Sequence, residues 1–291
     1  MQVIFHTGAH HTDDERLLKC LLNNKQDFSQ RGIAVPGPGK YRTLLKDAFG
    51  ALDEAQPSED ARDVLVDAIL DDEKANRLIL SNANFFGSPR FALGDGQLYP
   101  QATLRLHQLT QLFSGDRIEI FMAIRNPATF VPNVLGKANE QQRENILADN
   151  PPRYLRWSEL LRRIRNELPE LSLTVWCHED IPLIWGQIIR DMAGLAEGEQ
   201  IIGAFDILRD IMSKEGMRRF RAYLNEHPAT SERKKRQVMT AFLDKYADLE
   251  AMEEELDLEG WTEALVSELT ALYDFDVAEI RTIPGVRLIE P

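Results

Sequence analysis

The sequence predicts an α/β fold in which a parallel sheet lies between two layers of helices and a mostly helical C-terminal part follows. Four short apolar segments are rich in β-branched and aromatic residues, as is typical of strands buried on both faces. Segments with apolar residues at helical spacing separate these strands, which indicates right-handed crossovers and a three-layer arrangement. After about Gly198 no strand of comparable quality is predicted, and helical patterns dominate to about Ile280.

Strand and helix segments alternate along the first two thirds of the chain. The first helix is expected to begin near Thr12 or Asp13 and to end before Gly32. The loop at residues 87–100 holds several glycines and prolines and is a candidate lid that faces a substrate. The predicted strands are residues 2–6, 77–80, 118–124 and 171–177, and the later helical patterns are residues 61–70, 104–113, 154–168 and 181–192.

The chain has 291 residues, 43% of them hydrophobic, which is enough for one large domain with a buried core. We expect a single domain over residues 1–291, with the α/β core at residues 1–197 and the helical portion at residues 198–291. Cys20 lies in a predicted helix and Cys177 in a predicted strand. Because they are far apart in sequence, we expect two buried, reduced thiols rather than a disulfide.

The net charge of −13 disfavours a general nucleic-acid binder, because such a protein would repel phosphate. The apolar runs are shorter than a membrane span and no signal-peptide pattern follows Met1, so we expect no membrane span and a cytoplasmic location. Residues 214–236 hold eight basic side chains, and residues 244–263 hold nine acidic ones and one basic one. We expect two solvated surface helices that pair in part with each other; the alternative is a surface for a protein partner.

The first predicted strand runs directly into a glycine turn and a helix start, which is the layout of a phosphate-binding loop. Backbone N–H groups and a helix N-terminus meet at such a point, and both attract anions. A Walker loop would read G-x-x-x-x-G-K-[ST], and this chain lacks that pattern. In place of a lysine, a glycine and small hydroxyl residues, the loop carries His11, Asp13, Asp14 and Glu15.

Residues 8–15 resemble the loop of the bacterial sulfotransferase family that holds the 5′-phosphosulfate of the donor 3′-phosphoadenosine 5′-phosphosulfate. The family loop is close to G-A-H-K-T-G-T-T. In that pattern His11 falls on the lysine, Asp13 on the glycine, and Asp14 and Glu15 on the two threonines. The matching residues are Gly8, Ala9, His10 and Thr12.

Two further segments are similar to motifs of the same family. Residues 124–133 follow a strand and resemble the 3′-phosphate motif, an R-N-P core followed by a serine. Arg125 falls on the phosphate-binding arginine, and Asn133 replaces the serine with an amide that can still donate a hydrogen bond. Residues 80–87 resemble a Ser-x-Glu pattern in which Ala83 takes the place of the acid.

The resemblance implies a sulfotransferase-like P-loop fold and sulfuryl transfer from 3′-phosphoadenosine 5′-phosphosulfate to an unknown hydroxyl or amine acceptor. Arg125 and Asn133 would then hold the 3′-phosphate. His11 would take the electrostatic role of the lysine, and His10 is the best available general base. The residues around the 5′-phosphosulfate would be Gly8, Ala9, His10, His11 and Thr12.

A second interpretation is a catalytically inactive relative whose donor site is closed by Asp13, Asp14 and Glu15 and which serves as a binding or regulatory protein. Thr12 and Glu15 have the spacing of a helix capping box. A contact between like charges at 4 Å costs about 4 kcal/mol at an effective dielectric near 20. This cost exceeds the roughly 0.3–1 kcal/mol by which a helix dipole stabilises an anion, which argues against a working donor site. The sequence therefore supports two interpretations, an enzyme and an inactive relative.

Two other groups of polar residues have side chains of the types that bind ligands. His6 and the loop residues His10, His11, Asp13, Asp14 and Glu15 form a dense set of metal-ligand types without a standard spacing, so no metal is predicted. His178, Glu179 and Asp180 follow the fourth strand at the edge where α/β sheets place ligands. The simpler interpretation of the two acids is a helix N-terminus before Ile181.

Overall fold

A parallel sheet lies at the centre of the molecule. A computed structural model describes residues 1–228, 231–254 and 258–291. Within them, six strands form the sheet in the order β2-β3-β1-β6-β7-β8, and all neighbouring strands are parallel. The strands are β1 Gln2–His6, β2 Ile33–Ala34, β3 Arg77–Ser81, β6 Arg117–Ile124, β7 Ser172–Cys177 and β8 Val286–Ile289, and a separate antiparallel hairpin joins β4 Leu93–Gly94 to β5 Gln97–Leu98.

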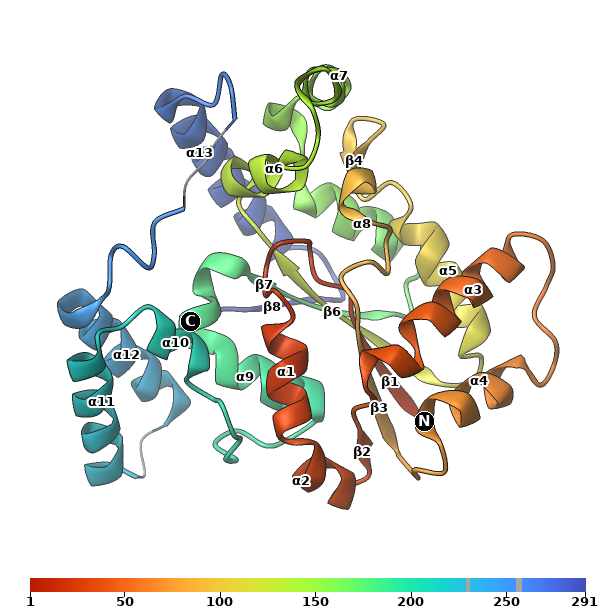
Figure 1. Ribbon diagram of the computed structural model, residues 1–291, viewed down its shortest axis with the longest axis horizontal. Coiled ribbons are helices and arrows are strands. Elements are labelled where there is room, and N and C mark those ends of the chain that lie inside the picture. The colour runs from red at the N-terminus through yellow and green to blue at the C-terminus, as the bar shows by residue number, and fades with distance from the viewer. Residues whose placement is uncertain (229–230, 255–257) are drawn as a thin grey trace.

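Helices cover both faces of the sheet (Figure 1). Alternate strand residues point to opposite faces, so Phe5 lies in one hydrophobic core and Ile4 in the other. The first core includes α3 Arg42–Leu52, α4 Ala61–Leu70, α5 Ala102–Leu112, α6 Pro127–Leu135, α8 Trp157–Glu167 and α13 Glu263–Ile280. The second includes α1 Arg16–Asn23, α2 Lys25–Gln30 and α9 Ile181–Ala193. These layers confirm the predicted three-layer α/β architecture.

The four predicted strands correspond to β1, β3, β6 and β7, with ends that differ by at most one residue. No strand of comparable quality was predicted after Gly198, and the one sheet strand described there, β8, lies beyond Ile280 and pairs with β7 in parallel. The four residues of β8 have an alternating, partly exposed pattern rather than the continuous apolar run of a central strand. Such a short edge strand carries a weak sequence signal.

The C-terminal helices divide between two places. One group forms a small core of its own around Leu208, Phe220 and Met239, on the left of Figure 1. By contrast, α13 contacts α6 and α8 and belongs to the core of the sheet. The small group consists of α10 Asp206–Asp210, α11 Lys214–Glu226 and α12 Glu232–Tyr246. The remaining α-helix, α7 Glu140–Asp149, follows α6 in the middle of the chain.

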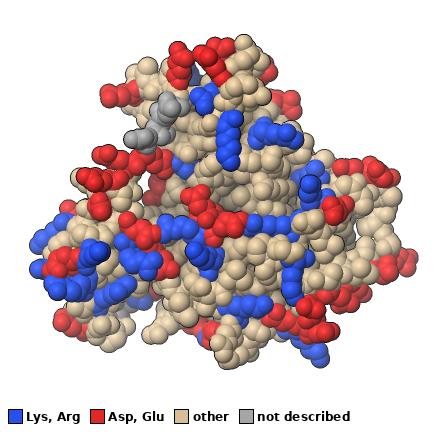
Figure 2. Space-filling view, viewed as in Figure 1, with Lys and Arg blue, Asp and Glu red and all other residues tan. Residues whose placement is uncertain are grey.

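Charged side chains cover the face drawn in Figure 2, with basic groups gathered over α11 at the lower left. In the described residues, the basic stretch pairs with acids inside or beside itself: Arg218 and Arg219 with Glu215, and Lys235 with Glu232. No ion pair joins residues 214–236 to the described part of 244–263. The expected pairing between the two stretches is therefore wrong for the described residues.

Both cysteines are buried and free, as predicted. Burial raises the pKa of each thiol, Cys20 and Cys177, to about 12, so both stay protonated near neutral pH. Among the described helices, none combines the length and the apolar character that crossing a membrane requires.

Candidate functional site

The predicted site lies at the carboxyl ends of β1 and β6, which are neighbours in the sheet. The chain leaves β1 toward α1 on one face and leaves β6 toward α6 on the other face. This is the reversal point at which α/β sheets open a crevice for ligands. The structure therefore brings the first loop, residues 7–15, beside the segment that begins at Arg125.

The first loop folds back on itself. The hydroxyl of Thr12 is buried and donates to the carbonyl oxygen of Ala9 at 2.6 Å. Gly8 has a φ of 63°, which glycine adopts at no steric cost. Its neighbour across the site is Ala83, whose methyl group would lie 3.6 Å from a Cβ at Gly8. The position expected for an acid thus brings only a methyl group to the loop.

Helix α1 begins at Arg16, so the predicted start near Thr12 or Asp13 is wrong. Asp14 and Glu15 have φ values of 45° and 62°, and left-handed residues cannot continue a right-handed helix. The predicted capping box is also wrong, because Glu15 lies outside the helix and forms an ion pair with Arg42 of α3. Asp13 partly replaces it by accepting from the backbone N–H of Leu17 at 3.2 Å.

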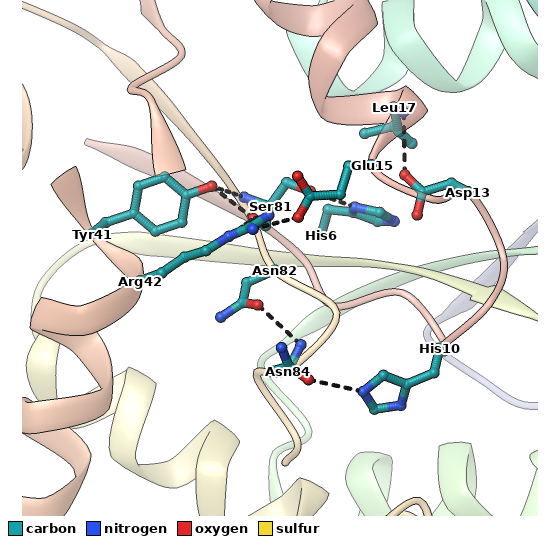
Figure 3. A network of polar contacts seen from close by, with 10 residues as sticks. All are labelled: His6, His10, Asp13, Glu15, Leu17, Tyr41, Arg42, Ser81, Asn82 and Asn84. Carbon is teal, nitrogen blue, oxygen red and sulfur yellow. Dashed lines mark hydrogen bonds and ion pairs between the residues drawn. The ribbon is translucent and has the colours of Figure 1, made fainter. Parts of the chain in front are cut away.

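His10 is held between two side chains of the segment that follows β3 (Figure 3 draws the contact with Asn84). The hydroxyl of Tyr99 accepts from the backbone N–H of His10 at 2.9 Å and lies 2.8 Å from its Nδ1. Nε2 faces the acceptor Asn84 Oδ1 at 3.1 Å and therefore carries the proton, so Nδ1 accepts from the Tyr99 hydroxyl. Burial lowers the pKa of His10, in agreement with this neutral tautomer.

His6 anchors the same region from the end of β1. Its Nδ1 lies 2.9 Å from the hydroxyl of Ser81, and its ring stacks on Trp176. Ser81 also binds Tyr41 through its backbone, so strand ends and α3 are joined in one polar network (Figure 3). Complete burial lowers the pKa of His6. Two buried histidines with lowered pKa values, His6 and His10, therefore support the loop.

His11 has a different environment, because its side chain lines a cavity instead of the polar network. Its φ is 58°, and its carbonyl oxygen accepts from the guanidinium of Arg125. Partial burial lowers the pKa of His11, and the positive charge of Arg125 lowers it further; Asp14 opposes this shift, and Lys137 adds the smallest lowering. The imidazole is accordingly neutral near pH 7.

Arg125 is buried, with 5% of its side chain exposed. Its guanidinium donates to the carbonyl oxygen of His11, to Thr129 Oγ1 at 2.9 Å and to the carboxylate of Glu254. Its own carbonyl oxygen accepts from the indole N–H of Trp157 at 2.8 Å. Glu254 belongs to the acidic stretch 244–263, so that stretch reaches the predicted phosphate site.

Asn133 lies two turns farther along α6. Its amide donates to the carbonyl oxygen of Thr129 at 2.8 Å, a bond within the helix. Arg125 and Asn133 therefore both contact Thr129, which places the two predicted 3′-phosphate residues on the same side of the helix start. The start itself is fixed by Asn126, which caps Ala128, and by Trp261, whose indole N–H donates to the carbonyl oxygen of Ala128 at 2.8 Å.

The segment after β7 also contacts this start. Glu179 accepts from the backbone N–H of Asn126 at 2.8 Å and from the hydroxyl of Tyr273 at 3.1 Å, so it is more than a helix-terminal acid. Burial raises the pKa of Asp180 to about 6 and lowers that of His178. In the described residues, no three histidine, cysteine or acidic side chains gather in a way that could hold a metal ion.

A cavity of about 780 Å³ opens beside the first loop. Its walls come from the candidate lid, from the C-terminal end of α6 and from α7. His11 and Asn133 are the two predicted site residues that reach it. Sequence reasoning missed Tyr99, Asn84 and Glu254; the acidic run was the available signal for the last.

Neither the models of known protein families nor the curated protein sequences contain a match to this chain.

Proposed function

We propose that this chain is a sulfotransferase-like protein whose donor site is closed by its own side chains and which acts by binding rather than by catalysis. The observation that carries the proposal is the state of Arg125. Its guanidinium is buried and already bonded to a carbonyl, a hydroxyl and a carboxylate of the chain. A nucleotide phosphate would have to displace Glu254, and its bond to the guanidinium would only replace a charged contact that the chain already makes.

The first loop opposes a bound phosphate as well. Asp13, Asp14 and Glu15 stand where the family pattern has a glycine and two threonines. Only Glu15 has its charge offset by an ion pair, that with Arg42, among the described contacts of these three acids. A doubly charged phosphate bound at the loop would lie close to Asp13 and Asp14. Each close contact between like charges there would cost several kilocalories per mole.

The two catalytic assignments also lack support. Stabilising the leaving phosphate requires a cation, whereas the surroundings of His11 lower its pKa and favour the neutral ring. A general base needs a free lone pair. In His10, Nδ1 accepts a hydrogen bond from the Tyr99 hydroxyl and Nε2–H donates to Asn84, so neither ring nitrogen has one. Both rings serve the loop and its surroundings better than they serve a transferred sulfuryl group.

Sulfuryl transfer from 3′-phosphoadenosine 5′-phosphosulfate is the second candidate function. Its support is the position of Arg125 at the carboxyl end of β6, beside the loop that follows β1. The side chain of Glu254 is 42% exposed, so a phosphate has an open path to compete with it. In this version the acceptor hydroxyl or amine attacks sulfur, the sulfur–oxygen bond to the nucleotide breaks, and the acceptor proton leaves to a base.

The two candidates are separated by titrating the protein with 3′,5′-phosphoadenosine in a calorimeter. We expect no heat of binding at millimolar nucleotide. Glu254→Gln, which keeps the shape of the side chain and releases the charge of Arg125, is expected to gain at most weak binding because the loop acids remain. Glu253→Gln is the matched control, since that residue is an exposed neighbour without a described side-chain contact.

Micromolar binding by the unmodified protein, abolished in Arg125→Lys, would contradict the closed site and support the enzyme. Lysine at this position keeps the positive charge but not the planar set of donors. Thermal unfolding of Arg125→Lys in the absence of nucleotide shows whether the variant is folded before its affinity is compared.

A further inference from the structure

The cavity beside His11 is lined by apolar, neutral polar and basic side chains. Of the 47 aspartates and glutamates in the sequence, none is among the described residues that line it. Most of the surface is apolar, with Leu93, Val134 and Ile146 contributing from three different elements. Its volume of about 780 Å³ lies within the range of cavities that enclose small organic ligands.

Two cations reach this cavity without a carboxylate partner. Lys137 forms no ion pair or side-chain hydrogen bond within the described part of the chain. Arg90 lies over the ring of Phe91, 4.5 Å from its centre, and forms no ion pair with any described acid. The remaining polar groups include the amides of Asn133, Gln142 and Asn145, which are neutral. The cavity is therefore positively charged in a protein with a net charge of −13.

We propose that this cavity binds an amphipathic anion, a small molecule with an apolar chain and one carboxylate, sulfate or phosphate head. The apolar walls hold the chain, and Lys137 and Arg90 supply the charge that recognises the head. Burying the chain gains about 0.8 kcal/mol for each CH₂ removed from water. The proposal deepens the proposed binding function and rests on it, because it names the ligand of a protein whose donor site is closed.

The contrast with Arg125 explains why the head would bind here. Arg125 already has Glu254, so an external anion gains nothing until that contact breaks. Lys137 and Arg90 have no such competitor among the described residues, and both lie where water reaches them. A ligand cation would meet repulsion from both, and a neutral chain would leave both unused.

The test uses dodecanoate as the probe, below the concentration at which it forms micelles, with calorimetry on the full chain. We expect dodecanoate to bind, and dodecanol and dodecyltrimethylammonium to bind at least about tenfold more weakly, a difference of about 1.4 kcal/mol. Hexanoate is expected to bind more weakly than dodecanoate, because it buries a shorter chain.

Three variants locate the probe. Lys137→Met and Arg90→Met are each expected to weaken dodecanoate about tenfold, and Ala138→Trp, which fills the cavity from the turn after α6, is expected to abolish binding. Lys19→Met is the matched control, because it removes an exposed lysine on α1 that does not line the cavity. Circular dichroism of each variant confirms that it is folded.

Absence of dodecanoate binding, equal binding of dodecanol, or equal losses in Lys19→Met and Lys137→Met would each overturn the inference. The nucleotide titration is run on the same samples and judges the proposed function separately. If the protein binds neither probe, the proposal of a closed donor site stands and that of an anion-binding cavity is refuted. If it binds 3′,5′-phosphoadenosine, the proposal of a closed donor site is refuted, whatever the result with dodecanoate.

Discussion

Arg125 precedes helix α6 and Lys137 follows it, and the two cations have opposite surroundings. Arg125 is buried and bonded to His11, Thr129 and Glu254. Lys137 is exposed on the rim of a cavity whose described lining contains no acid. The two cations differ in whether a carboxylate of the same chain already neutralises them. We therefore expect them to differ in how readily they bind an external anion.

The largest effect is expected from Arg125→Met. The substitution removes three hydrogen bonds from a buried position, each worth about 1 kcal/mol, so the free energy of unfolding should fall by about 3 kcal/mol. Urea unfolding monitored by circular dichroism measures it. Arg233→Met is the control, because that side chain is exposed and has no described partner. A loss below about 1 kcal/mol would mean that the Arg125 contacts contribute little to the closed state.

The second-largest effect is expected from acid, which should lower the free energy of unfolding. Burial lowers the folded-state pKa of His6, His10 and His178 below the ordinary value of 6.5. As the pH falls through 6.5, the unfolded chain binds protons that the folded chain does not bind. The stability is therefore complete above pH 6.5 and declines below it, by up to about 1.4 kcal/mol per pH unit for each histidine.

The measurement is urea unfolding at pH 7.5, 6.5 and 5.5. Replacing His6 with Gln should make the decline shallower than in the unmodified protein. Asp180 acts in the opposite direction, because burial raises its folded-state pKa to about 6 and its proton uptake stabilises the folded chain. The difference between this variant and the unmodified protein isolates the buried histidine. Equal slopes would contradict a neutral, buried His6.

The first loop offers a smaller test in Asp13 and Asp14. Asp13 accepts from the N–H of Leu17, and Asp13→Ala should cost about 1 kcal/mol, as for other helix caps. Asp14→Asn keeps a residue that tolerates the left-handed conformation and removes only its charge, so it should change stability by less than about 0.5 kcal/mol. Thermal unfolding compares them. Equal effects would contradict a specific contribution of the contact between Asp13 and Leu17.

The smallest effect completes the comparison with Arg125. Lys137→Met removes a charge from the cavity rim without breaking a described contact, so the free energy of unfolding should stay within about 0.5 kcal/mol of the original. The same urea unfolding used for Arg125→Met measures it. A large loss would show that Lys137 is committed to an internal partner, and the two cations would no longer differ in kind.

The central strands were predictable because β1, β3, β6 and β7 are buried on both faces and read as short apolar runs. β2 and β8 were missed because one has two residues and the other lies at the edge with a partly exposed pattern. Helix α1 starts later than predicted because residues 14 and 15 adopt left-handed conformations, which the acids in the sequence do not signal.

The site was predictable only in part. The resemblance singled out His11, Arg125 and Asn133. Arg125 lies just before the start of α6, Asn133 lies near its end, and His11 lies in the loop beside it. Glu254 could not be assigned to Arg125, because 129 residues separate the two and any of nine acids in its stretch had the right charge. The Tyr99 contact to His10 likewise depends on how the lid segment folds over the loop.

The indole bond from Trp261 to Ala128 has an optical consequence. Three of the four tryptophans, Trp157, Trp176 and Trp185, are almost fully buried, whereas Trp261 is half-buried at the start of α6. It follows the segment that holds Glu254 against Arg125. A ligand that moved this segment would change the surroundings of the most exposed indole and leave the other three nearly constant. The protein therefore carries an intrinsic fluorophore whose emission can follow the opening of the site without any attached dye.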